Sequence, residues 1–253
     1  MYSRLLSFLE TYKILYQNQF GFRKQHSTYM ALMLLIDEIT KSLENNEYVV
    51  GVFLDFSKAF DTVNHDILLK KLDHYGIRGN ALAWFKSYLH GREQFVTYNG
   101  TPSKTKIITC GVPQGSILGP LLFLIYINDL SKLCKELMSI LFADDTNMFK
   151  NGKDLNHLQN VINCELQSVS TWLKVNKLSL NIKKTHFMVF SNKRGSHDPI
   201  DIRIDGERIH EVLKTKFLGV YIDKNLSWKD HITYISGKIA RGLGMIIKTR
   251  KYL

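Results

Sequence analysis

The stretch Leu141-Phe142-Ala143-Asp144-Asp145-Thr146-Asn147-Met148-Phe149 places two adjacent carboxylates between apolar flanks. The flanks predict two short strands with a turn between them. Like charges held together in a partly buried place repel and raise their own pKa, and a bound hard cation commonly relieves the repulsion. Two interpretations follow: the stretch forms half of a magnesium site for phosphoryl transfer, or it is a surface hairpin in which Asp is favoured by the turn.

Composition limits the class of protein. The chain has 253 residues, 45% of them hydrophobic, which suits one large domain or two tightly joined subdomains. Its formal net charge of +11 indicates a polyanionic partner, with nucleic acid ahead of an anionic membrane, although a basic protein can lack such a partner. The longest apolar run, Ile117 to Ile127, is too short to span a bilayer. No membrane partner is therefore expected.

The three cysteines, Cys110, Cys134 and Cys164, stand far apart and show no CxxC spacing. This pattern predicts reduced, mostly core residues of an intracellular protein, in the nucleus or the cytoplasm. Neither a disulfide framework nor a zinc framework is expected.

Apolar residues at helical spacing predict several helices. They are expected over residues 2–16, after a cap at Ser27 or Thr28, from a cap at Asn64 to Gly76, across Ala81 to Leu89, after Gly119-Pro120, from about Leu155 to Val175, and beyond Trp228.

Apolar and β-branched runs predict the strands. The first, Tyr48 to Asp55, is expected to be buried and to deliver Asp55 at its end. Asn99-Gly100 is the strongest hairpin signal, joining two strands at Gln94–Tyr98 and Lys106–Thr109. Later strands are expected at Phe187–Phe190, Ile202–Ile204, Glu207–His210 and Lys216–Ile222.

Two loops carry residues suited to binding. The glycines of Gly111-Val112-Pro113-Gln114-Gly115-Ser116 permit close approach of the backbone to another group. This loop lacks the Lys-Ser/Thr ending of a nucleoside-triphosphatase phosphate loop, so that function is not expected. The basic loop Phe22-Arg23-Lys24-Gln25-His26 is either a phosphate grip or a solvated corner.

Taken in order, these pieces resemble the palm of a reverse transcriptase, and in detail the enzymes of LINE-type, non-long-terminal-repeat retrotransposons. The resemblance covers nearly the whole chain. It is carried by the segments Gln19-Phe20-Gly21-Phe22-Arg23, Phe53-Leu54-Asp55-Phe56-Ser57-Lys58-Ala59-Phe60-Asp61, Gly111-Val112-Pro113-Gln114-Gly115-Ser116, Phe142-Ala143-Asp144-Asp145 and Phe217-Leu218-Gly219-Val220.

The resemblance implies a catalytic set and a metal. Asp55, Asp144 and Asp145 match the family's carboxylates, which hold two Mg²⁺ ions, with Mn²⁺ as a possible substitute. The implied activity is RNA-directed DNA synthesis, in which a DNA primer is extended with deoxynucleoside triphosphates (dNTPs) along an RNA template.

The resemblance also implies binding residues. Phe60 matches the aromatic gate against the sugar 2′ position, with core packing as the alternative, and Lys183 or Lys184 matches a lysine near the pyrophosphate, with a solvated pair as the alternative. The whole substrate-binding set is Arg23, Phe56, Phe60, Gln114, Gly115, Lys183 and Lys184. The nucleic-acid-binding set, in the primer grip and the thumb, is Lys216, Gly219, Lys238, Arg241 and Lys248.

The expected fold is an α+β right-hand polymerase, with an antiparallel palm sheet backed by helices. Residues 1–47 are expected to be partial fingers, 48–228 the palm with an embedded fingers insertion, and 229–253 the start of a thumb. Upstream fingers sequence, a longer thumb and an endonuclease domain are not recognised, so the chain is expected to be a fragment or a decayed copy. Two rivals remain: a non-catalytic nucleic-acid-binding remnant, and an RNA-synthesising polymerase, against which the aromatic Phe60 argues.

Overall fold

A five-stranded sheet forms the centre of the computed structural model, which describes residues 1–193 and 197–250. The strand order is β11-β8-β1-β7-β6, and neighbours are antiparallel except for the parallel pair β11–β8. The strands are β1 (Tyr48–Leu54), β6 (Met138–Phe142), β7 (Asp145–Gly152), β8 (His186–Phe190) and β11 (His210–Glu211).

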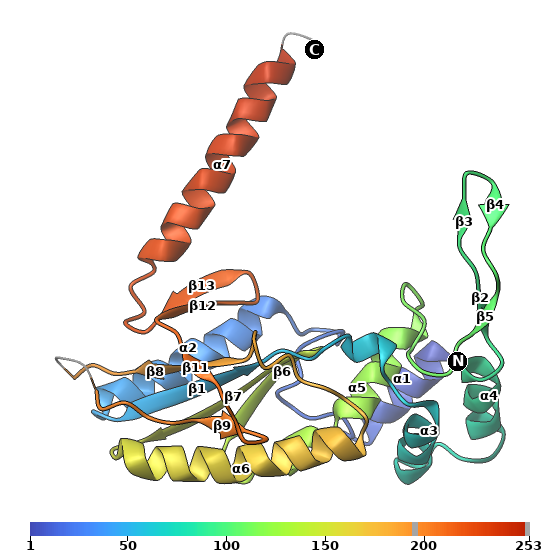
Figure 1. Cartoon of the computed structure of the whole chain (residues 1–253), viewed down its shortest axis with the longest axis horizontal. Coiled ribbons are helices and arrows are strands. Elements are labelled where there is room, and N and C mark those ends of the chain that lie inside the picture. Colours follow the sequence, from blue (N-terminus) through green and yellow to red (C-terminus); the bar gives the residue numbers. More distant parts are fainter. Residues whose placement is uncertain (194–196, 251–253) are drawn as a thin grey trace.

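Both faces of this sheet are buried, which explains the unbroken apolar sequence of β1. Alternate residues of a strand point to opposite faces, so Val50 and Val52 enter one core while Val49 and Phe53 enter another. The first core also contains α5 (Leu118–Ile127) and α6 (Leu155–Val175), and the second contains α2 (Thr28–Glu44). Figure 1 shows α6 running along one side of the sheet.

Three further helices extend the first core: α1 (Tyr2–Thr11), α3 (His65–His74) and α4 (Gly79–Leu89). The predicted caps are confirmed, because Ser27 accepts from Met30 N and Asn64 accepts from Ile67 N. The first helix ends at Thr11 and does not continue to residue 16. The chain reverses there because Lys13 adopts a positive φ of 49°.

A hairpin arm projects from the body between α4 and α5 (Figure 1). Its turn lies at the predicted dipeptide, where Asn99 and Gly100 have φ of 48° and 79°, the left-handed pair that a type I′ turn requires. The hairpin prediction is therefore confirmed. The arm's strands are β2 (Glu93–Gln94), β3 (Thr97–Tyr98), β4 (Thr101–Pro102) and β5 (Lys106–Ile107).

The C-terminal part begins with short strands and ends in a long helix. The single strand predicted at Lys216–Ile222 is wrong: it is a hairpin of β12 (Lys214–Phe217) and β13 (Val220–Asp223). Leu218 and Gly219, with φ of 46° and 90°, form its turn. The remaining short elements are η1 (Ala59–Asp61), η2 (Leu130–Lys132), β9 (Arg203–Ile204) and β10 (Glu207–Arg208).

Helix α7 (Lys229–Thr249) points away from the body (Figure 1). None of its residues is buried against the rest of the described chain. Over residues 1–193 and 197–250, no helix combines the length and the apolar character that crossing a membrane requires. The three cysteines are free, but only Cys134 is buried; Cys110 and Cys164 are exposed, so the prediction of core positions is wrong for these two.

Candidate functional site

The strand register brings two distant carboxylates together. β1 pairs with β7 so that Leu54 stands opposite Thr146. Asp55 follows Leu54 and Asp145 precedes Thr146, so the same register sets the two Asp residues opposite each other at the end of the strand pair. Directly opposed residues on antiparallel strands have Cα atoms about 5 Å apart. The carboxylates therefore meet because of strand pairing.

The hairpin predicted around Asp144 and Asp145 is confirmed. β6 pairs with β7 through Phe142 and Asp145, which leaves a two-residue turn of Ala143 and Asp144. Ala143 takes the left-handed conformation with φ of 57°. Asp144 is half-buried in this turn, while Asp145 is the first residue of β7 and stays accessible to solvent.

A cavity of about 100 Å³ lies where these strands end. Asp55 and Asp145 line it together with Lys184, His186 and Lys216. Lys183 and Lys184 are both exposed, but Lys183 is not part of the lining. Of the two lysines that the sequence left undecided, Lys184 is thus the one beside the carboxylates.

The pKa of Asp145 is raised above its ordinary value. Burial is the largest cause, because the protein around the cavity weakens the hydration of the ionised carboxylate even though part of the side chain reaches solvent. The negative charges of Asp144 and Asp55 add to the shift. The Asp145 carboxylate therefore lies within reach of the charges of both other Asp residues.

This carboxylate cluster suits a hard divalent cation in donor type and in charge. Oxygen ligands are what Mg²⁺ binds, and a cation would relieve the repulsion that raises the pKa of Asp145. Within the described ranges, no three His, Cys, Asp or Glu side chains are already arranged as a metal site. The Asp side chains would therefore have to rotate toward one point to hold an ion.

Gln19 and Gly21 support the Asp hairpin, a contact that the sequence did not reveal. The Oε1 atom of Gln19 accepts from the backbone N–H of Gly21 (2.9 Å) and of Ala143 (3.0 Å). A Cβ atom on Gly21 would stand 2.2 Å from Ala143 N, so only glycine fits this approach. Backbone bonds between residues 18–20 and Leu141 complete the joint. The sequence signal for this contact was that Gln19 and Gly21 belong to one motif, Gln19-Phe20-Gly21.

Phe60 lies between the core and the surface. Its ring stacks on Phe123 of α5 at 4.2 Å between centroids and meets the exposed Phe22 edge-on at 6.2 Å. The side chain is half-buried. Both sequence interpretations are compatible with this position, because one ring face packs on the core while the rest remains accessible.

The loop that contains Gln114 is hydrogen-bonded to the turn that contains Phe60. Val112 N donates to Phe60 O at 2.9 Å, and Gly111 N donates to Val63 O at 2.7 Å. The amide of Gln114 donates to Asp61 Oδ1 at 2.7 Å. Asp61 is thus a partner that the sequence analysis missed. The neighbouring Gly115 is exposed and has a φ of 75°.

Arg23 holds its own loop together. Its Nη1 atom donates to the carbonyls of Tyr16 (2.9 Å) and Gln19 (3.2 Å). Burial lowers the pKa of the guanidinium. The role of Arg23 in substrate binding stays a prediction. Phe56 is buried and forms a backbone bridge with Leu180, so its side chain belongs to the core.

Lys216 links the cavity to the base of α7. Its Nζ atom donates to the hydroxyl of Tyr234 at 3.2 Å and stands 4.9 Å from the centre of that ring. Lys238 is also 4.9 Å from the Tyr234 ring. The two lysines together lower the pKa of Tyr234. Of the other predicted nucleic-acid contacts, Gly219 lies in the β12–β13 turn, and Arg241 and Lys248 lie exposed on α7.

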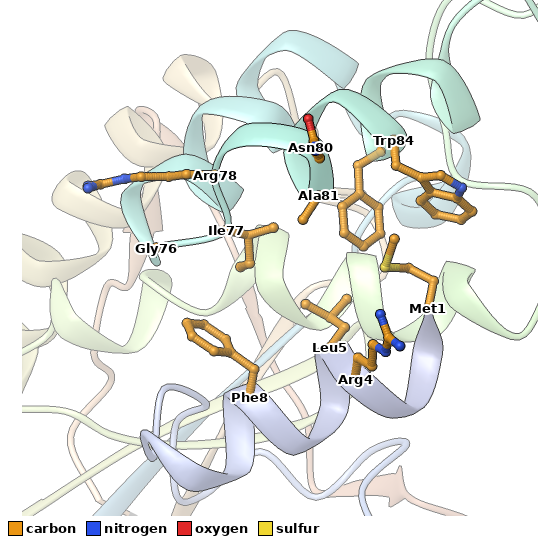
Figure 2. A pocket seen from close by; sticks show the side chains of 11 residues that line it. Met1, Arg4, Leu5, Phe8, Gly76, Ile77, Arg78, Asn80, Ala81 and Trp84 are labelled. Atoms are coloured by element: carbon orange, nitrogen blue, oxygen red, sulfur yellow. The ribbon is translucent and has the colours of Figure 1, made fainter.

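A second, larger cavity of about 450 Å³ lies between α1 and the α3–α4 pair (Figure 2). Its wall is mostly apolar, with Leu5, Phe8 and Trp84 among the residues shown. The guanidinium-bearing Arg4 and Arg78 also contribute. None of the site residues predicted from the sequence lines it, so it is separate from the carboxylate cluster.

Comparisons with known proteins identify the family of this chain. A family model described as reverse transcriptase (RNA-dependent DNA polymerase) matches residues 1–222. The RNA-directed DNA polymerase from mobile element jockey of Drosophila melanogaster is 30% identical over 260 residues, covering 98% of this chain and 28% of that protein. The jockey polymerase of Drosophila funebris is 31% identical over 238 residues, covering 91% of this chain and 26% of that protein. The chain thus spans little more than a quarter of the length of these curated relatives.

Solved structures extend the likeness to the fold. Telomerase from Candida albicans in complex with a TWJ fragment of telomeric RNA gives a TM-score of 0.58 at 13% identity, over 88% of this chain and 36% of that one. Apo telomerase from Candida Tropicalis gives a TM-score of 0.58 at 14% identity, covering 90% of this chain and 39% of that one. The predicted α+β right-hand polymerase fold is confirmed. The family match and the jockey likeness show that this chain belongs to the reverse transcriptase (RNA-dependent DNA polymerase) family, among relatives from non-long-terminal-repeat retrotransposons.

Proposed function

We propose that this chain is the polymerase part of a retrotransposon protein, which extends the 3′-hydroxyl of a DNA primer with dNTPs along an RNA template. One observation carries the proposal: Asp55 and Asp145 are opposed at the end of the β1–β7 pair, beside Asp144, in a cavity that Lys184 also lines. We propose an intracellular site of action, in the nucleus or the cytoplasm.

The carboxylates are assigned to metal binding. Proteins of this family use divalent metal ions, and Asp55, Asp144 and Asp145 are the side chains that would hold two Mg²⁺ ions, or Mn²⁺ in their place. When bound, the ions supply activation of the primer hydroxyl and neutralisation of the leaving pyrophosphate. Carboxylates carried at the ends of paired strands suit this chemistry because phosphoryl transfer depends mostly on positioning and on charge.

The remaining groups are assigned to the nucleotide. The Lys184 ammonium, on the cavity wall with Asp55 and Asp145, would donate a hydrogen bond or a proton to the pyrophosphate. Phe60 would stand against the sugar 2′ position with the part of its ring that does not pack on Phe123. Gln114 and Gly115 would pack against the incoming nucleotide and the template base.

The parts of the hand are assigned from the same fold. Residues 1–47 belong to the fingers, 48–228 form the palm with an embedded fingers insertion, and 229–253 belong to the thumb. The five-stranded sheet within the second range, the hairpin arm inserted between α4 and α5, and the separate course of α7 support this division.

The metal site is tested by replacing single carboxylates. Asp55→Asn and Asp144→Asn are each expected to abolish primer extension while primer–template binding stays nearly unchanged, because the metal ligands act on the reaction and not on duplex affinity. Adding Mg²⁺ should raise the thermal midpoint of the wild type, since the ion binds only the folded cluster, and should not raise that of either variant. Asp198→Asn, an exposed change away from the cavity, is the control.

Asp145→Asn gives a readout that needs no activity. A carboxylate whose pKa is raised in the folded state costs stability once pH rises through that pKa, and Asp145 has such a shift. Without Mg²⁺ at neutral pH, the variant should therefore unfold at a higher temperature than the wild type. The difference should disappear in acid, where Asp145 is protonated. Full extension by Asp144→Asn in Mg²⁺ would disprove the assignment, and wild-type binding without extension would favour the non-catalytic remnant.

A further inference from the structure

The cavity between α1 and the α3–α4 pair combines buried apolar side chains with an exposed aromatic ring (Figure 2). Leu5, Ile77 and Phe85 line it and are at most 7% exposed. Trp84 also lines it and is 40% exposed, so it stands where the cavity opens to solvent. The volume of about 450 Å³ is typical of small-molecule sites, which span about 300–1,000 Å³. Size and lining therefore fit a small ligand with an apolar body.

Contacts within the protein hold the walls of this cavity in place. The Trp84 ring stacks on Tyr88, one turn later in α4, with centroids 5.4 Å apart, and meets Phe85 edge-on at 5.2 Å. On α1, the Phe8 ring lies so close to Gly76 that a Cβ atom there would stand 3.4 Å from Cζ of Phe8. A ligand would thus enter a preformed site, which lowers the entropic cost of binding.

The charged side chains of the lining are cations. They are Arg4 of α1 and Arg78, the N-cap residue of α4. Among the described residues that line the cavity, none is acidic. Arg78 lies 3.6 Å from Asp73, but both side chains are exposed, so this ion pair holds the guanidinium only weakly. The lining is therefore complementary to an anionic group.

We propose that this cavity binds a small amphipathic anion, whose hydrocarbon body lies on Leu5, Ile77 and Phe85 and whose carboxylate pairs with Arg4. A nucleotide fits less well, because the N–H and C=O groups of a base would be buried against apolar side chains, and polar groups without partners are costly to bury. The cavity is separate from the carboxylate cluster, so this proposal stands independently of the proposed function.

The test uses decanoate, titrated into the whole chain in a calorimeter below the concentration at which it forms micelles. Wild type is expected to bind one decanoate per chain and to show a raised thermal midpoint, since the ligand binds the folded state. Two competitors test the chemistry: decyltrimethylammonium, with the same chain and the opposite charge, and deoxyadenosine monophosphate, with a polar base. Each should displace decanoate only at concentrations at least about tenfold higher than unlabelled decanoate requires.

Two substitutions separate the charge from the apolar cavity. Arg4→Gln should weaken decanoate binding about fivefold, the upper end for an exposed ion pair, and leave the binding of neutral decanol unchanged. Lys13→Gln is the matched control, because Lys13 is exposed after the end of α1 and outside the lining. Ala81→Phe fills part of the cavity and should weaken both ligands about tenfold, which corresponds to two CH₂ groups that are no longer buried.

Trp84→Ala removes part of the wall from the solvent side, where the loss of an exposed ring leaves the core intact, and should also weaken both ligands. Four results would overturn the proposal. They are no saturable binding of decanoate by wild type, equal affinity in wild type, Ala81→Phe and Trp84→Ala, equal effects of Arg4→Gln and Lys13→Gln, and displacement by deoxyadenosine monophosphate at concentrations as low as those of decanoate. The second would place the ligand elsewhere, and the last would indicate a nucleotide site.

Discussion

At the scale of single residues, Phe60 is shared between packing and the proposed site. Stacking on Phe123 at 4.2 Å anchors one ring face, and the half-buried position leaves the other part of the ring for a ligand. Phe60→Val is expected to raise ribonucleotide incorporation because it opens space at the 2′ position, with a smaller effect on dNTP use. The ratio of kcat/KM for the two nucleotide types is the measurement.

This substitution also has a packing cost, of about 2 kcal/mol for a half-buried aromatic side chain. Phe8→Val controls for that cost, since Phe8 is partly buried against the same core and lies on α1. It should lose similar stability and keep the sugar selectivity of the wild type. If Phe60→Val also keeps that selectivity, Phe60 is a core residue and the gate lies elsewhere.

At the scale of elements, the segment before α2 is joined to the β6–β7 hairpin through Gln19. This side chain is 2% exposed and accepts from two backbone N–H groups. Gln19→Ala leaves both groups buried without a partner, at about 1–3 kcal/mol each, so the free energy of unfolding should fall by at least about 2 kcal/mol. Urea unfolding measures the change.

The control is Gln17→Ala, because Gln17 lies two residues earlier and is exposed. Its effect on the free energy of unfolding should stay within about 0.5 kcal/mol. Equal effects of the two substitutions would contradict the structural joint. A loss of extension in Gln19→Ala at a temperature where it is still folded would further indicate that the joint positions Asp144 and Asp145.

At the scale of the whole molecule, the net charge of +11 is expected to govern affinity for nucleic acid. Helix α7 stands clear of the body and presents Lys238, Arg241 and Lys248. Changing all three to Gln should reduce the salt slope of primer–template binding by up to about 2.7, at about 0.9 per phosphate of duplex. The matched control is a triple change to Gln of three lysines exposed on the body, Lys70, Lys135 and Lys153. An equal reduction of the salt slope in both triple variants would mean that the duplex does not bind preferentially along α7.

Short-range patterns in the sequence were enough to predict many of the caps and turns of this molecule. The Asn64 cap, the Asn99-Gly100 turn and the hairpin around Asp144 are short-range signals, and each was predictable because its hydrogen bonds or dihedral angles involve neighbouring residues. The family was also in the sequence, as an ordered set of motifs. Local pattern failed at Lys216–Ile222, where a mostly apolar run predicted one strand although it contains the turn at Leu218-Gly219.

Only the tertiary structure decided which groups meet. Register between β1 and β7 opposes Asp55 and Asp145, ninety residues apart, and the cavity wall distinguishes Lys184 from Lys183. Gln19 is hydrogen-bonded to Ala143, and Gln114 to Asp61, and in neither pair does the sequence of one segment predict contact with the other. The sequence by itself therefore determined most helices, strands and turns and the kinds of functional side chain present, because these depend on residues close together in the chain. Their meeting depends on strand pairing and two-sided core packing, which only the folded chain brings about.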